Sequence, residues 1–236
     1  DVYKYLDSRG EMPLRYGYGV SWTFGMPNMD MKDYEMGAGT DTVWITSMSP
    51  RAIDGAGSRM CISLERDSQA VTDAAGEVSG MMGLSAISEW WPRGQCHMDI
   101  EYSGGTRGAR IKRNYFPEWF FKVDSSGLRS ANNHVSGDES HSRYLTMLER
   151  LDRQNPGSVK GWAMDHCNLI NPEDVPRVAK LGLMWSCHMV NAVATPVGAA
   201  FGDDVLHTYA VPIKSMVDAG INVSQEGHWD ELEILI

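Results

Sequence analysis

Apolar runs and amphipathic stretches alternate regularly in the second half of the chain. Short apolar runs flanked by turn residues predict four strands, at 128–135, 159–166, 183–188 and 221–226. Apolar residues at helical spacing predict the helices between them, at 138–153, 172–181 and 203–219. Such alternation is typical of a parallel sheet with crossover helices, so we expect an α/β fold.

The first half of the chain is less regular. Two β-rich runs, 14–20 and 42–48, predict strands, and the segment 25–39 between them predicts a loop or a short helix. From about 66 to 122 the periodicity is weak, and Gly and Pro interrupt it. A stretch of this length without clear elements is often an active-site lid or an insertion, so we treat 1–236 as one domain with a possible lid at 66–122.

Polar side chains occur where each of the four later strands ends. They are His134, the pair Asp165 and His166, then His188, and finally Glu226 with His228 close behind. In a parallel barrel the carboxyl ends of all strands meet at one face, which carries the chemistry. No glycine-rich dinucleotide-binding fingerprint follows a strand. A (β/α)8 barrel of the TIM type is therefore favoured over a doubly wound sheet.

The chemistry that these strand ends suggest is metal binding, because imidazole is the commonest protein ligand for zinc and also suits iron. Any one histidine at a strand end could equally be a hydrogen-bonded structural residue. The other histidines lack this placement, and we expect His141 and His207 to lie on helix surfaces.

Composition excludes several classes of function. The chain has 21 basic and 31 acidic residues, a net charge of −10, which argues against a nucleic-acid partner. It contains no apolar run long enough to cross a membrane and no visible signal peptide, so we favour a cytoplasmic location. Four cysteines without a CxxC pair suggest scattered buried thiols.

Several motifs resemble the amidohydrolase superfamily, specifically amidohydrolase family 3. The first is His134-Val-Ser-Gly137-Asp138 at a strand end. The second is Asp165-His166, followed by a helix that reads Pro172-Glu173-Asp174-Val-Pro-Arg177 and ends in Leu181-Gly182. Weaker similarities are Gly10–Arg15 and Ile53-Asp54-Gly55. The match has suitable spacing from about 126 to 223.

The resemblance implies roles for individual residues. His134 and His166 fall on metal-ligand positions of barrel strands five and six, and His188 falls on a substrate-facing position. Asp165 stands where the family has Glu, and we expect it to be a catalytic residue.

The chain also departs from the family pattern. The family's H-x-H pair of strand one, the bridging Lys near strand four and the Asp of strand eight have no counterpart, so the chain would supply only about strands three to eight of the barrel. We expect Glu226 to replace that Asp as the general base and His228 to be a further metal ligand.

These inferences predict a metal-dependent hydrolase in which a metal-activated water attacks an amide-like C–N bond of a small molecule. Zinc is the expected metal, with iron or manganese as alternatives. Trp90 and Trp91 could line the substrate pocket. The competing hypothesis is a non-catalytic or structural barrel chain that another polypeptide completes. In either case we expect a homo-oligomer or a partner segment that completes the barrel.

Overall fold

The structure is a computed structural model that describes residues 2–21, 30–50, 53–54, 61–64, 116–187, 198 and 201–225. Its strands are β1 (Tyr16–Ser21), β2 (Val43–Ser49), β3 (Asn133–Val135), β4 (Ala163–His166), β5 (Met184–Cys187) and β6 (Asn222–Gln225). Its helices are α1 (Val2–Ser8), the 3-10 helix η1 (Met31–Asp33), α3 (Phe116–Ser125), α4 (Asp138–Gln154), α5 (Asp174–Leu181), α7 (Asp203–Tyr209) and α8 (Ile213–Asp218).

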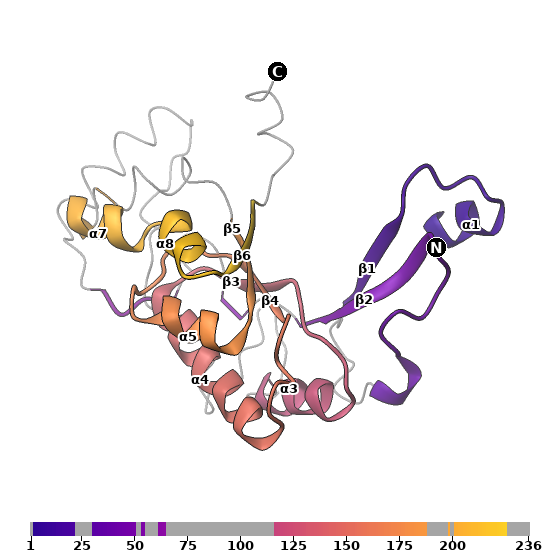
Figure 1. Cartoon of the computed structure of the whole chain (residues 1–236), viewed down its shortest axis with the longest axis horizontal. Helices are drawn as coiled ribbons and strands as arrows, with labels where there is room; N and C mark the ends of the chain where they lie inside the picture. The colour runs from indigo at the N-terminus through magenta and orange to yellow at the C-terminus, as the bar shows by residue number, and fades with distance from the viewer. Residues whose placement is uncertain are drawn as a thin grey trace, which may run out of the picture.

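The described strands all pair in parallel, and they do so in the order of the sequence. β1 pairs with β2, and a second sheet has the order β3-β4-β5-β6. A parallel bridge between Met48 and Ser130 connects the end of β2 to the segment that leads into β3. Figure 1 shows α1, β1 and β2 extending to one side of the other elements. The fold is therefore α/β with parallel sheets, as the alternation predicted, and the described residues do not form a closed barrel.

The core lies between the four-stranded sheet and the helices that follow its strands. α4 packs against α5, and α5 packs against α8 (Figure 1). Leu145 and Leu148 of α4 and Val178 of α5 are fully buried with Trp185 of β5. Amphipathic helices bury one apolar face against the sheet in this way.

The helices of the second half confirm the sequence prediction closely, whereas the strands are shorter than predicted. β3 and β4 begin several residues later than expected, because Val159 is buried in a turn and Leu128 and Trp162 are buried in irregular segments rather than in strands. An apolar run indicates that a segment is buried. Burial alone does not distinguish a strand from a packed turn. The helix predicted at 203–219 is divided at Pro212 into two helices, α7 and α8.

Two helices were not predicted, and two aromatic side chains have a plain packing role. α1 and α3 lie in regions where the periodicity gave no clear pattern. Trp119 and Phe120 of α3 are buried in the core, where the Phe120 ring contacts Tyr144 at 5.1 Å.

In the part of the chain that the structure describes, no helix is long and apolar enough to cross a membrane.

The prediction of scattered thiols is wrong for the cysteines that are described. Cys167 and Cys187 form a disulfide with a Cα–Cα distance of 5.1 Å, and Cys61 is also disulfide-bonded. The first pair is far apart in sequence but adjacent in space, because His166 and Cys187 face each other in the register of β4 and β5. The disulfide therefore joins the carboxyl ends of two neighbouring strands.

Candidate functional site

Two of the predicted metal ligands meet at the carboxyl ends of β3 and β4. The ring centroids of His134 and His166 are 3.8 Å apart, and the ring planes are inclined by 52°. The parallel register places Val135 of β3 opposite His166 of β4. Two strand ends that the chain separates by about thirty residues thus bring two imidazoles into contact, as the sequence predicted.

The backbone of His166 makes this contact possible. Successive residues of a strand point to opposite faces of the sheet, so Asp165 shares a face with His134, and His166 would point to the other face. However, His166 has φ of 80° and Cys167 has φ of 34°, so the chain leaves the strand conformation where β4 ends. Non-glycine residues rarely adopt positive φ, and such residues are concentrated at functional sites.

A buried carboxylate, Asp54, lies beside the His134 ring. The Nδ1 atom of His134 is 3.6 Å from Oδ1 of Asp54, and the Asp54 side chain is fully buried. The backbone N–H of Ile53 also donates a hydrogen bond of 3.0 Å to the carbonyl oxygen of His134. Both the ring and the main chain of His134 are therefore in contact with residues 53–54.

Asp54 also binds the start of α4. Its carboxylate accepts hydrogen bonds from the backbone N–H groups of Ser136 at 2.8 Å and Gly137 at 2.9 Å, and from the hydroxyl of Ser140 at 2.7 Å. Gly137 is the N-cap residue and has no side chain to cap the helix. A carboxylate at this place satisfies free N–H groups and is favoured by the helix dipole.

Gly137 is required by the close approach of another backbone. A Cβ atom on this residue would lie 1.9 Å from the carbonyl oxygen of Cys61. The glycine of the motif that begins at His134 therefore allows the segment around Cys61 to pass directly over the start of α4.

Asp138, the next residue of the motif, does not contact the histidine pair through any interaction that the structure gives it. Its carboxylate accepts hydrogen bonds from the backbone N–H and the hydroxyl of Ser63. Burial is the main cause that raises the pKa of the Asp138 carboxyl group above its ordinary value, and the bonds from Ser63 act in the opposite direction. The residue tethers the segment 61–64 to α4.

The expectation that His141 lies on a helix surface is wrong. His141 belongs to α4, but it is fully buried, and its Nδ1 lies 2.7 Å from the carbonyl oxygen of Gly137. Its ring makes an edge contact with Trp185 at 5.7 Å. By contrast, His207 is exposed, as predicted.

The remaining predicted site residues divide into one that is described and five that are not. Asp165 is half-buried and lies opposite His134 in the sheet register. The residues that lie outside the described part of the chain are Trp90, Trp91, His188, Glu226 and His228. Within the described residues, no group of three or more His, Cys, Asp or Glu side chains could hold a metal ion.

The described side chains nevertheless include part of a ligand set that suits a divalent metal. His134 and His166 offer two imidazoles at one point, and His134 Nδ1 is buried without a hydrogen-bond partner among the described residues. Catalytic zinc sites use three protein ligands with histidine prominent among them. The pair would supply two of these, and the third would come from another strand end.

The sequence did not indicate a role for Asp54, whose carboxylate lies 3.6 Å from Nδ1 of His134. The sequence contained a weak indication of this residue, because Ile53-Asp54-Gly55 was one of the weaker similarities to the family. An acidic residue next to glycine is ordinary for a turn, so the pattern alone could not indicate contact with a residue eighty positions later.

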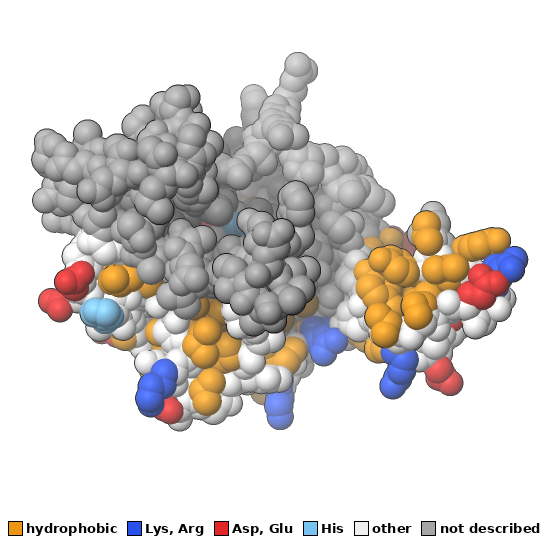
Figure 2. All heavy atoms as spheres, turned by 90° about the horizontal axis from the view of Figure 1, so that it is seen from above, with side chains coloured by type: hydrophobic (Ala, Val, Ile, Leu, Met, Phe, Trp, Pro, Cys, Tyr) orange, Lys and Arg blue, Asp and Glu red, His pale blue; other side chains and the backbone are white. Residues whose placement is uncertain are grey.

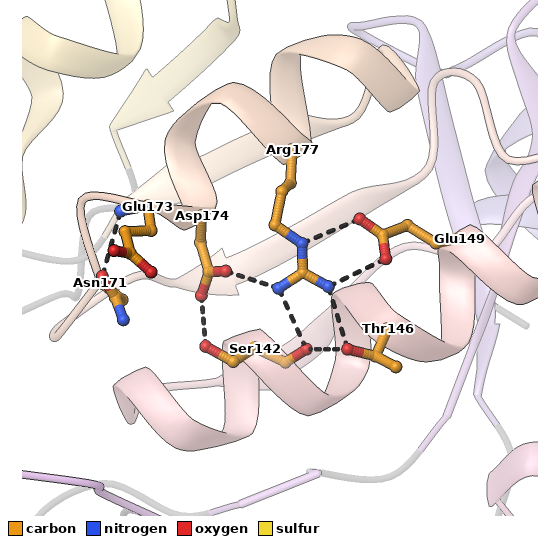
Figure 3. Close-up of polar contacts among 7 residues, drawn as sticks. All are labelled: Ser142, Thr146, Glu149, Asn171, Glu173, Asp174 and Arg177. Carbon is orange, nitrogen blue, oxygen red and sulfur yellow. Dashed lines mark hydrogen bonds and ion pairs between the residues drawn. The ribbon is translucent and has the colours of Figure 1, made fainter.

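The helix motif that carries much of the resemblance forms a polar network between α4 and α5. Arg177 donates hydrogen bonds to Glu149 at 2.8 and 3.1 Å and to Asp174 at 2.7 Å, and it also donates to Thr146 (Figure 3). Asp174 accepts a further bond from the Ser142 hydroxyl. The acidic residue and the arginine of the motif therefore hold α5 against α4, which are the helices that follow the two histidine-bearing strands.

The chain matches no known family model and no curated protein. It is similar in structure to an uncharacterized metal-dependent hydrolase from Pyrococcus furiosus, with a TM-score of 0.60 and 12% identity, and the match covers 94% of this chain and 38% of that protein. A second one, from Pyrococcus horikoshii OT3, has a TM-score of 0.58 and 14% identity, with coverage of 94% and 37%.

These similarities concern the fold. The chain has a fold that occurs in metal-dependent hydrolases, and it spans less than two fifths of the length of the two proteins that it matches.

Proposed function

We propose that the chain carries part of the active site of a metal-dependent hydrolase of the amidohydrolase type. The observation that carries this proposal is the contact between His134 and His166, whose ring centroids are 3.8 Å apart at the ends of adjacent parallel strands. Two structures of the same fold belong to proteins named as metal-dependent hydrolases, which supports the same class of function. A divalent cation, zinc first and iron or manganese as alternatives, would lower the pKa of a bound water molecule towards neutral pH.

The residues of the chain have the following roles in this proposal. His134 and His166 would hold the cation, with His228 as a further ligand. Asp165, on the same face of the sheet as His134, and Glu226 accept and return the proton that moves between the water and the leaving group. His188, Trp90 and Trp91 contact the substrate, an N-substituted amide or a related small molecule with a C–N bond.

The arrangement of the strands supports a barrel. Parallel strands that neighbour each other in the order of the sequence, with a bridge from β2 to the segment before β3, are what an arc of a (β/α)8 barrel requires. We propose that the described strands are such an arc and that a further segment or polypeptide completes it beside β1.

Metal content tests the proposal. His134→Ala and His166→Ala should each greatly reduce the zinc bound per chain, because each removes one of few ligands. Elemental analysis after dialysis against zinc measures this, and His207→Ala, which changes an exposed histidine of α7, is the matched control. If both site variants retain the zinc content of the control, the proposed metal site is wrong.

A further inference from the structure

We propose that the cavity between β2 and Arg129 is a binding site for a small aromatic carboxylate. The cavity has a volume of about 330 Å³ and is lined by Met36, Gly37, Trp44, Ile45, Thr46 and Arg129. This proposal goes beyond the proposed hydrolase activity and does not depend on a metal site.

The cavity lies along one edge of β2. The backbone N–H of Ile45 donates a hydrogen bond of 3.0 Å to the carbonyl oxygen of Ala38, and the N–H of Met48 donates one of 2.7 Å to that of Arg129. Thr46 is between these two contacts. Arg129 precedes β3, so the cavity is at the amino-terminal end of that strand, whereas His134 lies near its carboxyl end.

Arg129 presents a cation that is held in place but has no carboxylate partner. Its Nε and Nη2 atoms both donate to the carbonyl oxygen of Thr46, at 3.0 and 2.7 Å. Among the described residues, no side-chain carboxylate forms an ion pair with this guanidinium. The Nη1 group and the second N–H of Nη2 therefore remain for a ligand. Together they form the fork that binds a carboxylate through two parallel hydrogen bonds.

Trp44 provides a flat apolar wall whose position is fixed from the side of β1. The guanidinium of Arg15 lies over the indole, 5.0 Å from the ring centroid, and its Nε donates a hydrogen bond of 2.9 Å to the carbonyl oxygen of Asp41. Gly17 allows the indole to lie close to β1, because a Cβ atom there would be 3.3 Å from two of the ring atoms. The indole can therefore serve as a preformed surface for a ligand.

These features favour a ligand with one negative charge and a flat apolar body. The unpaired guanidinium of Arg129 attracts an anion, and Met36, Trp44 and Ile45 surround the space beside it. An aromatic ring gains from contact with an indole and with a methionine sulfur. An inorganic anion would leave the apolar walls unused, and an amine would be repelled by Arg129.

A purely structural role of Arg129 is the competing explanation, because its side chain already connects Thr46 of β2 to the segment before β3. The two explanations differ in the wild-type chain. A structural arginine requires no ligand, whereas a binding site must distinguish an aromatic acid from a neutral molecule of the same shape.

The experiment titrates the ¹⁵N-labelled wild-type chain with benzoate, with the neutral isostere benzamide and with acetate, at constant ionic strength. The chain has eight tryptophans, whose indole N–H groups give separate NMR signals. Trp44→Phe identifies the signal of Trp44. Arg129→Met removes the cation, and Arg150→Met, at an exposed position of α4, is the matched control.

We expect benzoate to shift the Trp44 signal saturably, with a dissociation constant on the order of 1 mM, which suits a ligand of this size. Benzamide should bind at least about tenfold more weakly, because it cannot form charge-assisted hydrogen bonds with Arg129. Acetate, which lacks the apolar body, should also bind at least about tenfold more weakly. Arg129→Met should reduce benzoate affinity by at least about tenfold, and Arg150→Met should leave it unchanged.

The proposal is overturned if benzoate does not shift the Trp44 signal saturably, or if benzamide or acetate binds as well as benzoate. These comparisons use the wild-type chain and need no variant to fold. It is also overturned if Arg129→Met, folded by circular dichroism, binds benzoate with the affinity of the wild type.

Discussion

His141 shows how a single buried side chain can make the fold sensitive to acid. Its imidazole is fully buried on α4, its Nδ1 contacts the carbonyl oxygen of Gly137, and its Nε2 has no hydrogen-bond partner among the described residues. Burial is the largest cause that lowers the pKa of His141 below its ordinary value near 6.5, whereas the Gly137 carbonyl and the charges of Asp54 and Asp174 act in the opposite direction. The neutral ring is therefore the form that the folded chain favours.

The folded chain then binds a proton at His141 less readily than the unfolded chain does. The free energy of unfolding should decrease as the pH falls below about 6.5, because protons bind preferentially to the unfolded state. His141→Asn keeps a donor towards the Gly137 carbonyl and removes the titrating ring, so its stability should depend less on pH below about 6.5.

Urea unfolding at several pH values measures this dependence. His207→Asn on the exposed side of α7 should keep the wild-type slope. An unchanged slope in His141→Asn would contradict the prediction.

At the scale of elements, α4 and α5 are joined by charged side chains rather than by apolar packing alone. Arg177 of α5 reaches Glu149 and Asp174, and the Asp174 side chain is almost fully buried. A charged group that is buried must keep its partners, because an unpaired charge loses its solvation without compensation. The arginine therefore stabilises the pair of helices that support the two histidine-bearing strands.

Arg177→Met should leave Asp174 with fewer donors and reduce the free energy of unfolding by about 1–3 kcal/mol. Chemical denaturation monitored by circular dichroism measures this change. Arg150→Met, at an exposed position of α4, is the matched control and should change stability by less than about 0.5 kcal/mol. Equal effects of the two substitutions would show that the network does not contribute to stability.

At the scale of the whole molecule, exposed apolar side chains gather on the part formed by α1 and β1. Figure 2 shows this group on the lobe that extends away from the larger sheet. It consists of large side chains from the first sixteen residues: Val2, Tyr3, Tyr5, Leu14 and Tyr16. Tyr3 and Tyr16 stack with their ring centroids 4.2 Å apart. Contiguous exposed apolar surface often marks a site of association.

This surface should cause the isolated chain to self-associate as its concentration rises. Leu14→Ser removes a side chain that is 72% exposed, and it should therefore weaken association without destabilising the core. Sedimentation velocity at increasing concentration measures the association. Val217→Ser, which changes a side chain of α8 that is 57% exposed, is the control and should associate like the wild type. Association that Leu14→Ser leaves unchanged would place the contact elsewhere.

The sequence by itself determined the class of fold and the order of the elements from β3 to β6. Helical spacing of Leu145, Leu148 and Leu151 defined α4, and Gly182, in the left-handed conformation with φ of 65°, ended α5 as predicted. These features are local: a helix stripe and a C-terminal glycine depend on neighbours within a few residues. The placement of His134 and His166 at one point also followed, because parallel strands bring their carboxyl ends to the same edge.

Only the tertiary structure decided which polar groups surround those histidines. The contact of Asp54 with His134, the burial of His141 and the disulfide between Cys167 and Cys187 join residues that are distant in sequence or face inward from an otherwise polar stretch. Such contacts depend on how segments cross one another, and a single sequence contains no periodic signal for them. The strand lengths were decided in the same way, since buried turns and buried strands share the same apolar composition.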